Sequence, residues 1–80
     1  MMIDEFELNY ALSNKREFVN YKQFNCILKR ELYALVCYFT AKGTIIVALN
    51  GTIKYEGYDT GLVCKTYNSI YCALKGKRVA

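Results

Sequence analysis

The sequence contains no histidine and no proline, and it has only five glycines in 80 residues. Without histidine, the chain lacks the side chain that most often transfers protons near neutral pH. The glycines form no phosphate-binding loop, because none of Gly51, Gly57 and Gly61 is followed by Gly-Lys-Ser or Gly-Lys-Thr. These absences predict a protein that is not an enzyme and that uses no cofactor.

Long apolar runs are also absent. The longest, residues 32–39, is far shorter than the ~20 residues needed to cross a bilayer. The first ten residues, MMIDEFELNY, are acidic and lack the basic and then hydrophobic regions of a signal peptide. We therefore expect a cytoplasmic protein without a membrane partner.

The four cysteines do not show the spacing of a metal site. Cys26, Cys37, Cys64 and Cys72 are separated by 11, 27 and 8 positions, whereas zinc ligands usually come in pairs two to four residues apart. Without a secretion signal we interpret them as small reduced core residues rather than a disulfide framework. Only Cys64, next to Lys65, has a context that could activate a thiol, and we interpret it as structural too.

A chain of this length makes a single small domain, residues 1–80. It is 54% hydrophobic and has eight tyrosines and four phenylalanines. A domain of this size buries only ~60% of its unfolded surface, so either the aromatic residues pack into a tight core or some remain exposed at a binding surface. The sequence leaves both alternatives open.

The N-terminal segment has helical spacing and acids in its first turn, which favour a helix N-terminus. The apolar positions are Ile3, Phe6 and Tyr10, and the acids are Asp4, Glu5 and Glu7. We expect a break at Ser13-Asn14, where Asn14 precedes Glu17 by three residues as in a capping box.

Residues 18–43 show a further helical rhythm. The apolar positions are Phe18, Tyr21, Leu28, Leu32, Leu35 and Phe39, and they predict an amphipathic helix that ends near Gly43. Residues 32–40 are apolar on both faces and rich in strand-forming residues, so they also fit a buried strand that turns at 41–43. We predict helix through Leu32 and leave the remainder open.

The clearest local signal lies at residues 44–56. Asn50-Gly51 tolerates the positive φ angles of a tight hairpin turn, and β-branched residues flank it on both sides. A loop at 56–61 follows, and then a helix capped by Thr66 and stopped by Gly76. The expected fold is α+β, with a helical N-terminal half, a β-hairpin at about 44–56 and a short basic C-terminal helix at about 66–76.

Positive charge gathers near the C-terminus. Residues 61–80 carry four bases and no acid, whereas residues 1–20 carry four acids and two bases. This asymmetry predicts an anionic partner for the C-terminal segment. A helix from Thr66 would present Asn68, Ser69 and Tyr71 to a major groove and hold Lys75, Lys77 and Arg78 close to phosphates.

The segment Thr66-Tyr67-Asn68-Ser69-Ile70-Tyr71-Cys72-Ala73-Leu74-Lys75-Gly76 resembles the recognition helix of lac-repressor-type helix-turn-helix proteins, in which a Ser or Thr cap is followed by Thr-Val, Ala-Leu and a glycine. It is also similar to the modular DNA-binding segments attached to homing endonucleases. The resemblance implies that Tyr67, Asn68 and Tyr71 face bases and that Thr66 and Lys77 lie near phosphates. Residues 60–65 are too short for the preceding helix of that family and lack its glycine turn.

The first prediction is therefore a non-enzymatic protein that binds duplex nucleic acid. The predicted contact residues are Thr66, Tyr67, Asn68, Tyr71, Lys75, Lys77 and Arg78.

A protein partner is the alternative. In its small size and its many Asn, Lys, Ile and Tyr residues, the chain resembles phage-encoded inhibitors of host machinery, including anti-CRISPR and anti-defence proteins. That resemblance implies binding to a host protein or nucleoprotein complex. The working surface would be exposed tyrosines at Tyr55, Tyr58, Tyr67 and Tyr71, and a homodimer is a further expectation.

Overall fold

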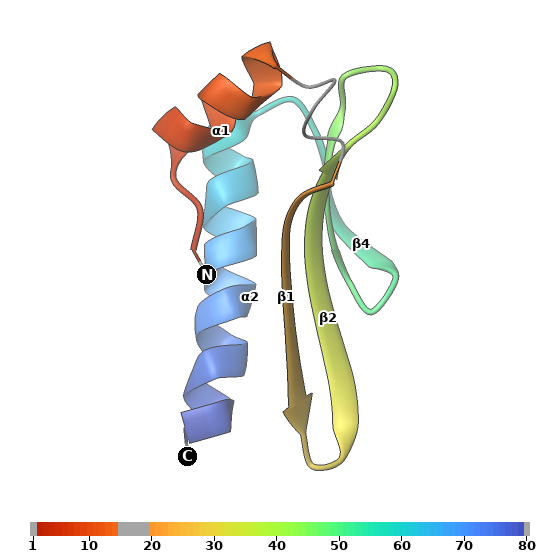
Figure 1. Cartoon of the computed structure of the whole chain (residues 1–80), viewed down its shortest axis with the longest axis vertical. Coiled ribbons are helices and arrows are strands. Elements are labelled where there is room, and N and C mark those ends of the chain that lie inside the picture. Colours follow the sequence, from red (N-terminus) through yellow and green to blue (C-terminus); the bar gives the residue numbers. More distant parts are fainter. Residues whose placement is uncertain (1, 15–19, 80) are drawn as a thin grey trace.

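The computed structural model describes residues 2–14 and 20–79, and for residues 77–79 it describes the backbone alone. In these ranges the chain forms two helices and four strands (Figure 1). The elements are α1 (Glu5–Ser13), β1 (Asn20–Leu28), β2 (Glu31–Phe39), β3 (Ile45–Leu49), β4 (Thr52–Gly57) and α2 (Thr60–Val79). The strands form one antiparallel sheet in the order β1-β2-β3-β4.

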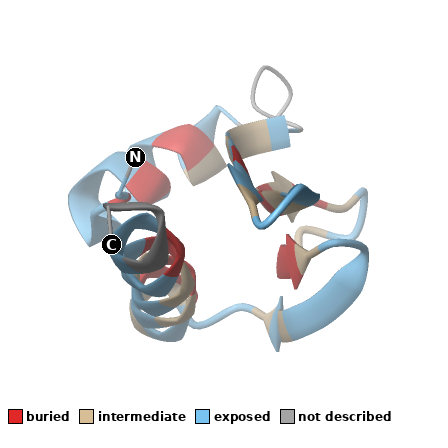
Figure 2. Cartoon of the chain, turned by 90° about the horizontal axis from the view of Figure 1, so that it is seen from below, coloured by how far each residue is buried: buried red, intermediate tan, exposed pale blue. Residues whose placement is uncertain are grey.

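Both helices lie on the same side of the sheet (Figures 1 and 2). One core cluster joins Leu8 of α1, Leu35 and Val47 of the two central strands, and Val63 and Tyr67 of α2, all of them fully buried. The opposite side of the sheet has no helix over it in the described residues (Figure 2). The described residues thus form a two-layer α+β arrangement with both helices on one side of the sheet.

The prediction of a helical N-terminal half is wrong. Residues 20–39 form the long antiparallel pair β1 and β2, and only α1 is helical before them. Residues 32–40, which the sequence left open, are strand up to Phe39. The predicted helix start at Phe18 and the Asn14–Glu17 capping box involve residues 15–19 and lie outside the described residues.

The error came from reading an alternating pattern as a helical one. On β2 the positions Leu35, Cys37 and Phe39 are buried against the helices, which is the two-residue period of a strand. The residues between them, Val36 and Tyr38, are also apolar and half-buried on the other side. Because both sides carry apolar residues, the alternation is hidden and the three-and-four spacing is accidental.

The predicted hairpin at 44–56 is confirmed. Residues Ile45–Leu49 and Thr52–Gly57 pair as β3 and β4, and the turn has φ of 52° at Asn50 and 82° at Gly51. These are the two positive φ angles of a type I′ turn. Asn50 also ties the turn to β2, because its Oδ1 accepts a hydrogen bond of 2.8 Å from the Ala34 N–H.

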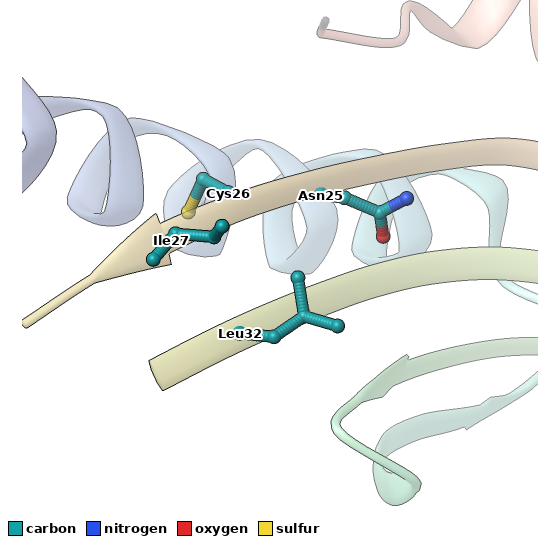
Figure 3. A pocket seen from close by; sticks show the side chains of 4 residues that line it. All are labelled: Asn25, Cys26, Ile27 and Leu32. Carbon is teal, nitrogen blue, oxygen red and sulfur yellow. The ribbon is translucent and has the colours of Figure 1, made fainter. Parts of the chain in front are cut away.

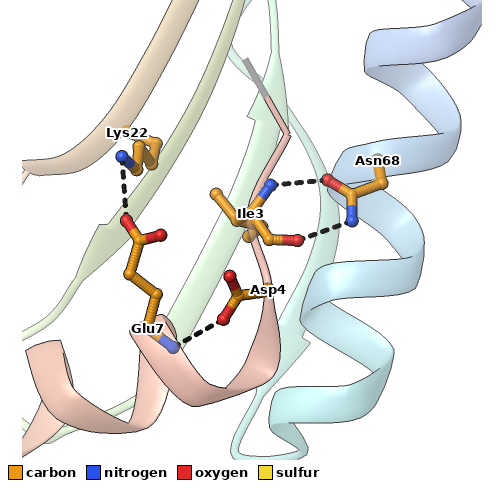
Figure 4. A network of polar contacts seen from close by, with 5 residues as sticks. All are labelled: Ile3, Asp4, Glu7, Lys22 and Asn68. Carbon is orange, nitrogen blue, oxygen red and sulfur yellow. Dashed lines mark hydrogen bonds and ion pairs between the residues drawn. The ribbon is translucent and has the colours of Figure 1, made fainter.

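The first helix begins as its acids suggested. The Oδ1 atom of the N-cap Asp4 accepts a hydrogen bond of 2.7 Å from the Glu7 N–H (Figure 4). The helix ends at Ser13, next to the expected break. The helical spacing of Ile3, Phe6 and Tyr10 predicted that all three are on the apolar side of the helix. Ile3 is indeed buried, but Phe6 and Tyr10 are exposed, and Leu8 of α1 is buried instead.

The C-terminal helix is longer than predicted at both ends. It begins at Thr60 rather than Thr66, and it continues through Gly76 to Val79. Its N-terminus is capped by Asp59, whose Oδ1 accepts a hydrogen bond of 3.1 Å from the Leu62 N–H. No helix within the described ranges is long and apolar enough to cross a membrane.

Candidate functional site

Two of the predicted base-reading residues face the core. The side of α2 that packs on the sheet carries Val63, Tyr67, Tyr71 and Leu74, with Tyr67 fully buried and Tyr71 nearly so. The Tyr71 ring meets the Phe24 ring of β1 edge to face, at 4.7 Å between ring centroids. Neither tyrosine is therefore available to contact bases or a protein partner on this surface.

The early start of α2 explains this placement. Since the helix begins at Thr60, Val63 and Cys64 are helical and buried, and they fix an inward stripe at 63, 67, 71 and 74. The sequence predicted that the helix starts at Thr66, and for a helix that starts there nothing indicated that Tyr67 is buried. Burial raises the pKa of Tyr67 to about 12, and its Oη atom has no hydrogen-bond partner among the described residues.

Asn68 holds the N-terminal segment against α2 (Figure 4). Its Oδ1 accepts a hydrogen bond of 2.9 Å from the Ile3 N–H, and its Nδ2 donates one of 2.7 Å to the Ile3 carbonyl. This pair satisfies both backbone groups of a residue that is extended beside the helix. The Asn68 side chain therefore bonds to the backbone of Ile3, whereas the sequence predicted that it contacts a nucleic-acid base.

The remaining predicted contact residues on α2 separate into two places. Thr66 is half-buried in the middle of the helix, whereas Lys75 is exposed near its C-terminal end. The Lys75 ammonium lies 5.6 Å from the centre of the Tyr71 ring and 3.4 Å from the Tyr71 hydroxyl. Lys77 and Arg78 follow in the last turn of α2.

A second set of bases, which the sequence reading missed, lies at the tip of the β1–β2 hairpin. Leu28 pairs with Glu31, so Lys29 and Arg30 alone make the turn. Their φ angles are 51° and 70°, again the two positive values of a type I′ turn, and both residues are exposed. The sequence did not indicate a hairpin turn here, because the turn contains neither asparagine nor glycine.

The hairpin tip and the end of α2 lie at the same end of the molecule (Figure 1). From the Phe24–Tyr71 contact, β1 runs four more residues, or about 13 Å, to Leu28. From the same contact α2 runs eight more residues, or about 12 Å, to Val79. We call this region the basic end, and it comprises Lys29, Arg30, Lys75, Lys77 and Arg78.

A shallow hollow opens beside the basic end (Figure 3). It measures about 390 Å³ and is lined by Asn25, Cys26, Ile27 and Leu32 of the β1–β2 hairpin. Its lining includes no charged side chain. It therefore offers apolar contact next to the bases rather than a site for an ion.

The opposite end of the molecule carries acids. Glu5 of α1 accepts a hydrogen bond of 2.9 Å from the Thr60 hydroxyl, which places the start of α1, with its N-cap Asp4 and the first-turn Glu7, beside the start of α2 at Asp59. We call these four acids, Asp4, Glu5, Glu7 and Asp59, the acidic end. Bases are also present at this end, because Lys22 of β1 pairs with Glu7 at 3.2 Å and Lys42 is exposed between β2 and β3. The basic end in turn includes an exposed acid, Glu31, next to Arg30.

The two other predicted tyrosines lie close to the acidic end and differ in their roles. Tyr55 is half-buried, and its hydroxyl accepts a hydrogen bond of 3.0 Å from the Asp59 N–H. Tyr58 is 71% exposed in the connection between β4 and α2. Only Tyr58 of the predicted set is therefore an exposed aromatic side chain.

The thiols lie in surroundings that oppose activation. Burial raises the pKa of Cys37 to about 12, with the neighbouring Cys64 as a smaller cause, and burial also raises the pKa of Cys64. Both stay protonated near neutral pH, so Lys65 does not make Cys64 a nucleophile. The described residues hold no cluster of three or more potential metal ligands.

Comparison of the chain with protein-family models, with curated proteins and with solved structures finds no match. Its function is therefore inferred from its own residues and their geometry.

Proposed function

We propose that the protein is a small non-enzymatic binding protein that contacts the phosphates of duplex nucleic acid through its basic end. A cytoplasmic location, where thiols stay reduced, belongs to this proposal. The contacts come from the hairpin tip and from the end of α2, rather than from a recognition helix that reads bases. Duplex nucleic acid is thus still the expected partner, but α2 contacts its phosphates rather than its bases.

The observation that supports it is the composition of the Lys29-Arg30 turn. A residue other than glycine in the left-handed region costs roughly 1 kcal/mol or more, and this turn places two such residues in succession. Asn-Gly would fill the same turn without that cost, as it does between β3 and β4. Two exposed bases in a strained turn, at the end where α2 brings three more, indicate a demand for positive charge.

Charge of this kind binds nucleic acid through its phosphates. Each phosphate that a base neutralises releases condensed counterions, so the logarithm of the affinity falls with the logarithm of salt by about 0.9 per contact. The two-stranded shape of the tip is also suitable, because a β-ribbon fits a major groove. Contacts to phosphates position the protein and carry no sequence information by themselves.

The test is fluorescence anisotropy of a labelled mixed-sequence duplex at about 50 and about 200 mM salt. We expect the parent protein to bind at low salt and to lose about 10-fold or more in affinity at the higher salt. Replacing the tip by Lys29→Asn and Arg30→Gly should weaken binding by about 10-fold and lower the salt slope by about 2, while the turn keeps its shape.

A matched control removes the same number of charges elsewhere. Lys42 and Lys54 are exposed and lie outside the basic end, so Lys42→Gln with Lys54→Gln should leave most of the binding intact. The proposal is wrong if the parent protein does not bind at low salt. It is also wrong if the control variant loses as much affinity as the tip variant.

A protein partner is a second candidate, favoured by the acidic end. Tyr58 there is exposed, and so is Phe6, which follows the Glu5 that bonds to Thr60. Exposed aromatic rings among acids suit a protein surface that carries positive charge, such as one that itself binds nucleic acid. This candidate replaces the predicted tyrosine surface, since Tyr67 and Tyr71 are buried.

The second candidate is tested by capture on immobilised protein from a cell lysate, followed by quantification of the captured proteins. Phe6→Ser with Tyr58→Ser should release a specific partner, whereas Lys29→Asn with Arg30→Gly should retain it. A partner that is lost only with the tip variant would contradict binding at the acidic end.

A further inference from the structure

The end of the β1–β2 hairpin projects beyond the four-stranded part of the sheet. β3 pairs with β2 over residues 35–39, whereas β1 and β2 stay paired with each other as far as the Lys29-Arg30 turn. In Figure 1 the hairpin accordingly extends past the turn between β3 and β4. Residues 25–34 therefore form a ribbon of two strands with two bases at its tip, and we call them the ribbon.

The two sides of the ribbon differ in what covers them. The inner side faces α2 and carries the buried Cys26 and the half-buried Leu28, both packed into the core cluster. The outer side carries Asn25, Ile27 and Leu32. Ile27 and Leu32 form a ladder pair and are 69% and 62% exposed, and with Asn25 they line the hollow in Figure 3. Two large apolar side chains are thus exposed directly behind the basic turn.

The acid of this region lies on the inner side of the ribbon. Glu31 pairs with Leu28, and its Oε2 accepts a hydrogen bond of 3.2 Å from the Tyr33 hydroxyl. Because side chains alternate along a strand, Glu31 and Tyr33 lie on the side opposite to Leu32. The outer side is therefore uncharged, and a polyanion that contacts it meets the bases of the tip without meeting a carboxylate of the ribbon.

The ribbon has the dimensions of a reader of the major groove. Paired strands lie about 4.8 Å apart, and the major groove of B-form DNA, about 12 Å wide and about 8.5 Å deep, admits a ribbon of two strands. Packed layers lie roughly 10 Å apart, so with the outer side on the groove floor the end of α2 lies near the height of the phosphates at the rim. The major groove of A-form RNA is too narrow for such an approach.

The base edges in the major groove offer an apolar contact at the C5-methyl group of thymine. The exposed side chains of Ile27 and Leu32 can bury such methyl groups. Asn25 lies two residues before Ile27 on the same side, and asparagine is the side chain that bonds to two atoms of adenine. The residue types of the outer side therefore suit A·T pairs in DNA.

We infer that the ribbon enters the major groove of B-form DNA with its outer side toward the base edges, where Ile27 and Leu32 bury thymine methyl groups. The inference rests on the proposed function, because Lys29, Arg30 and the end of α2 contact the phosphates of the same groove. It adds a preference for DNA with A·T pairs, which phosphate contacts alone do not give.

Two duplexes that differ only in thymine methyl groups test the inference with the parent protein. One contains an alternating A·T tract, and the other contains the same tract with deoxyuridine in place of thymidine, so charge and base pairing are the same. At about 50 mM salt, fluorescence anisotropy should show weaker binding to the deoxyuridine duplex, by about 4-fold for each methyl group that is buried. An RNA duplex of the same sequence should bind at least as weakly as the deoxyuridine duplex.

Two variants distinguish a direct methyl contact from a change in the shape of the DNA. Ile27→Ser with Leu32→Ser should bind the two DNA duplexes within about 2-fold of each other, because the side chains that bury the methyl groups are absent. Ile53→Ser is the matched control and should keep the parent's preference. Ile53 is 50% exposed and pairs with Ala48 on the same side of the sheet, but it lies outside the ribbon. Circular dichroism verifies that each variant is folded.

Equal affinity of the parent for the thymidine and deoxyuridine duplexes would overturn the inference. A preference that survives in the Ile27→Ser, Leu32→Ser variant or disappears in Ile53→Ser would overturn it too, as would RNA binding as tight as that of the thymidine duplex. In each of these cases salt-dependent binding to DNA would leave the proposed phosphate contacts standing. Absence of binding to either DNA duplex at low salt would instead overturn the proposed function, and this inference with it.

Discussion

The two tight turns of the sheet have the same backbone shape and different residues. The β3–β4 turn uses Asn50 and Gly51, and the β1–β2 turn uses Lys29 and Arg30, with positive φ at all four positions. Asparagine and glycine adopt this shape at little cost, whereas lysine and arginine do not. Asn50-Gly51 therefore fits its turn with little strain. Lys29-Arg30 places two charges at an exposed tip, and its backbone strain lowers the stability of the protein.

The difference allows the stability of the protein and its proposed binding of nucleic acid to be tested separately. If the Lys29-Arg30 turn serves only to connect strands, replacing it by Asn-Gly should stabilise the protein and leave its binding unchanged. If it serves binding, the same replacement should stabilise the protein and weaken its contact with an anionic partner. The variants below test this contrast, from the largest expected effect to the smallest.

The largest effect should come from giving the β3–β4 turn the residues of the other turn. Asn50→Lys with Gly51→Arg forces two long side chains into positive φ and removes the hydrogen bond from the Ala34 N–H to Asn50. We expect a loss of about 3 kcal/mol in the free energy of unfolding, from about 1 kcal/mol for each of the three changes. Urea unfolding measures it, and an unchanged midpoint would show that the turn tolerates bases freely.

A smaller loss should follow from Gly51→Ala alone. A Cβ atom at this position would meet nothing within 4 Å, so backbone strain at φ of 82° is the only expected cost. We expect a destabilisation of about 1 kcal/mol in chemical unfolding, which corresponds to a fall of roughly 4–8 °C in Tm. A stabilised variant would contradict the positive φ at this turn.

The opposite sign is expected at the β1–β2 turn. Lys29→Asn with Arg30→Gly relieves the strain of both residues and should raise the free energy of unfolding by about 1 kcal/mol. Thermal unfolding at a fixed salt concentration measures the change. Destabilisation would show that the bases hold the tip in place through contacts of their own.

The smallest effect on stability should come from removing charge and keeping the strain. Lys29→Gln with Arg30→Gln leaves side chains of similar length at the same φ angles, so the free energy of unfolding should change by less than about 0.5 kcal/mol. Binding to duplex DNA should nevertheless weaken as much as in the Asn-Gly variant. Equal binding by the parent and this variant would separate the strained turn from any role in recognition.

The same two turns show how far local sequence predicts the fold. Asn50-Gly51 predicted the β3–β4 hairpin correctly, because asparagine and glycine themselves favour positive φ. Lys29-Arg30 carried no such signal, so the sequence predicted a helix through Leu32 and left residues 32–40 open between helix and strand. On β2 the alternation of Leu35 and Cys37 was masked by the apolar Val36 between them, which lies on the side of the sheet away from the helices.

The candidate site was predicted in part. The positive charge of the C-terminal segment was evident, and Lys75 is exposed as expected. The inward placement of Tyr67 and Tyr71 was missed because it depends on where α2 begins, and Asp59 rather than Thr66 caps that helix. The partnership of Asn68 with Ile3 joins residues 65 positions apart, which no local pattern indicates.

The sequence by itself determined the α1 N-terminus at Asp4, the Asn50-Gly51 hairpin and the excess of bases near the C-terminus, because each depends on residues within a few positions of one another. Tertiary structure decided the rest. The pairing of β1 with β2, the inward side of α2 and the placement of the Lys29-Arg30 turn at the same end of the molecule as the end of α2 all follow from long-range packing. Burial of apolar surface between distant segments outweighs local preference there.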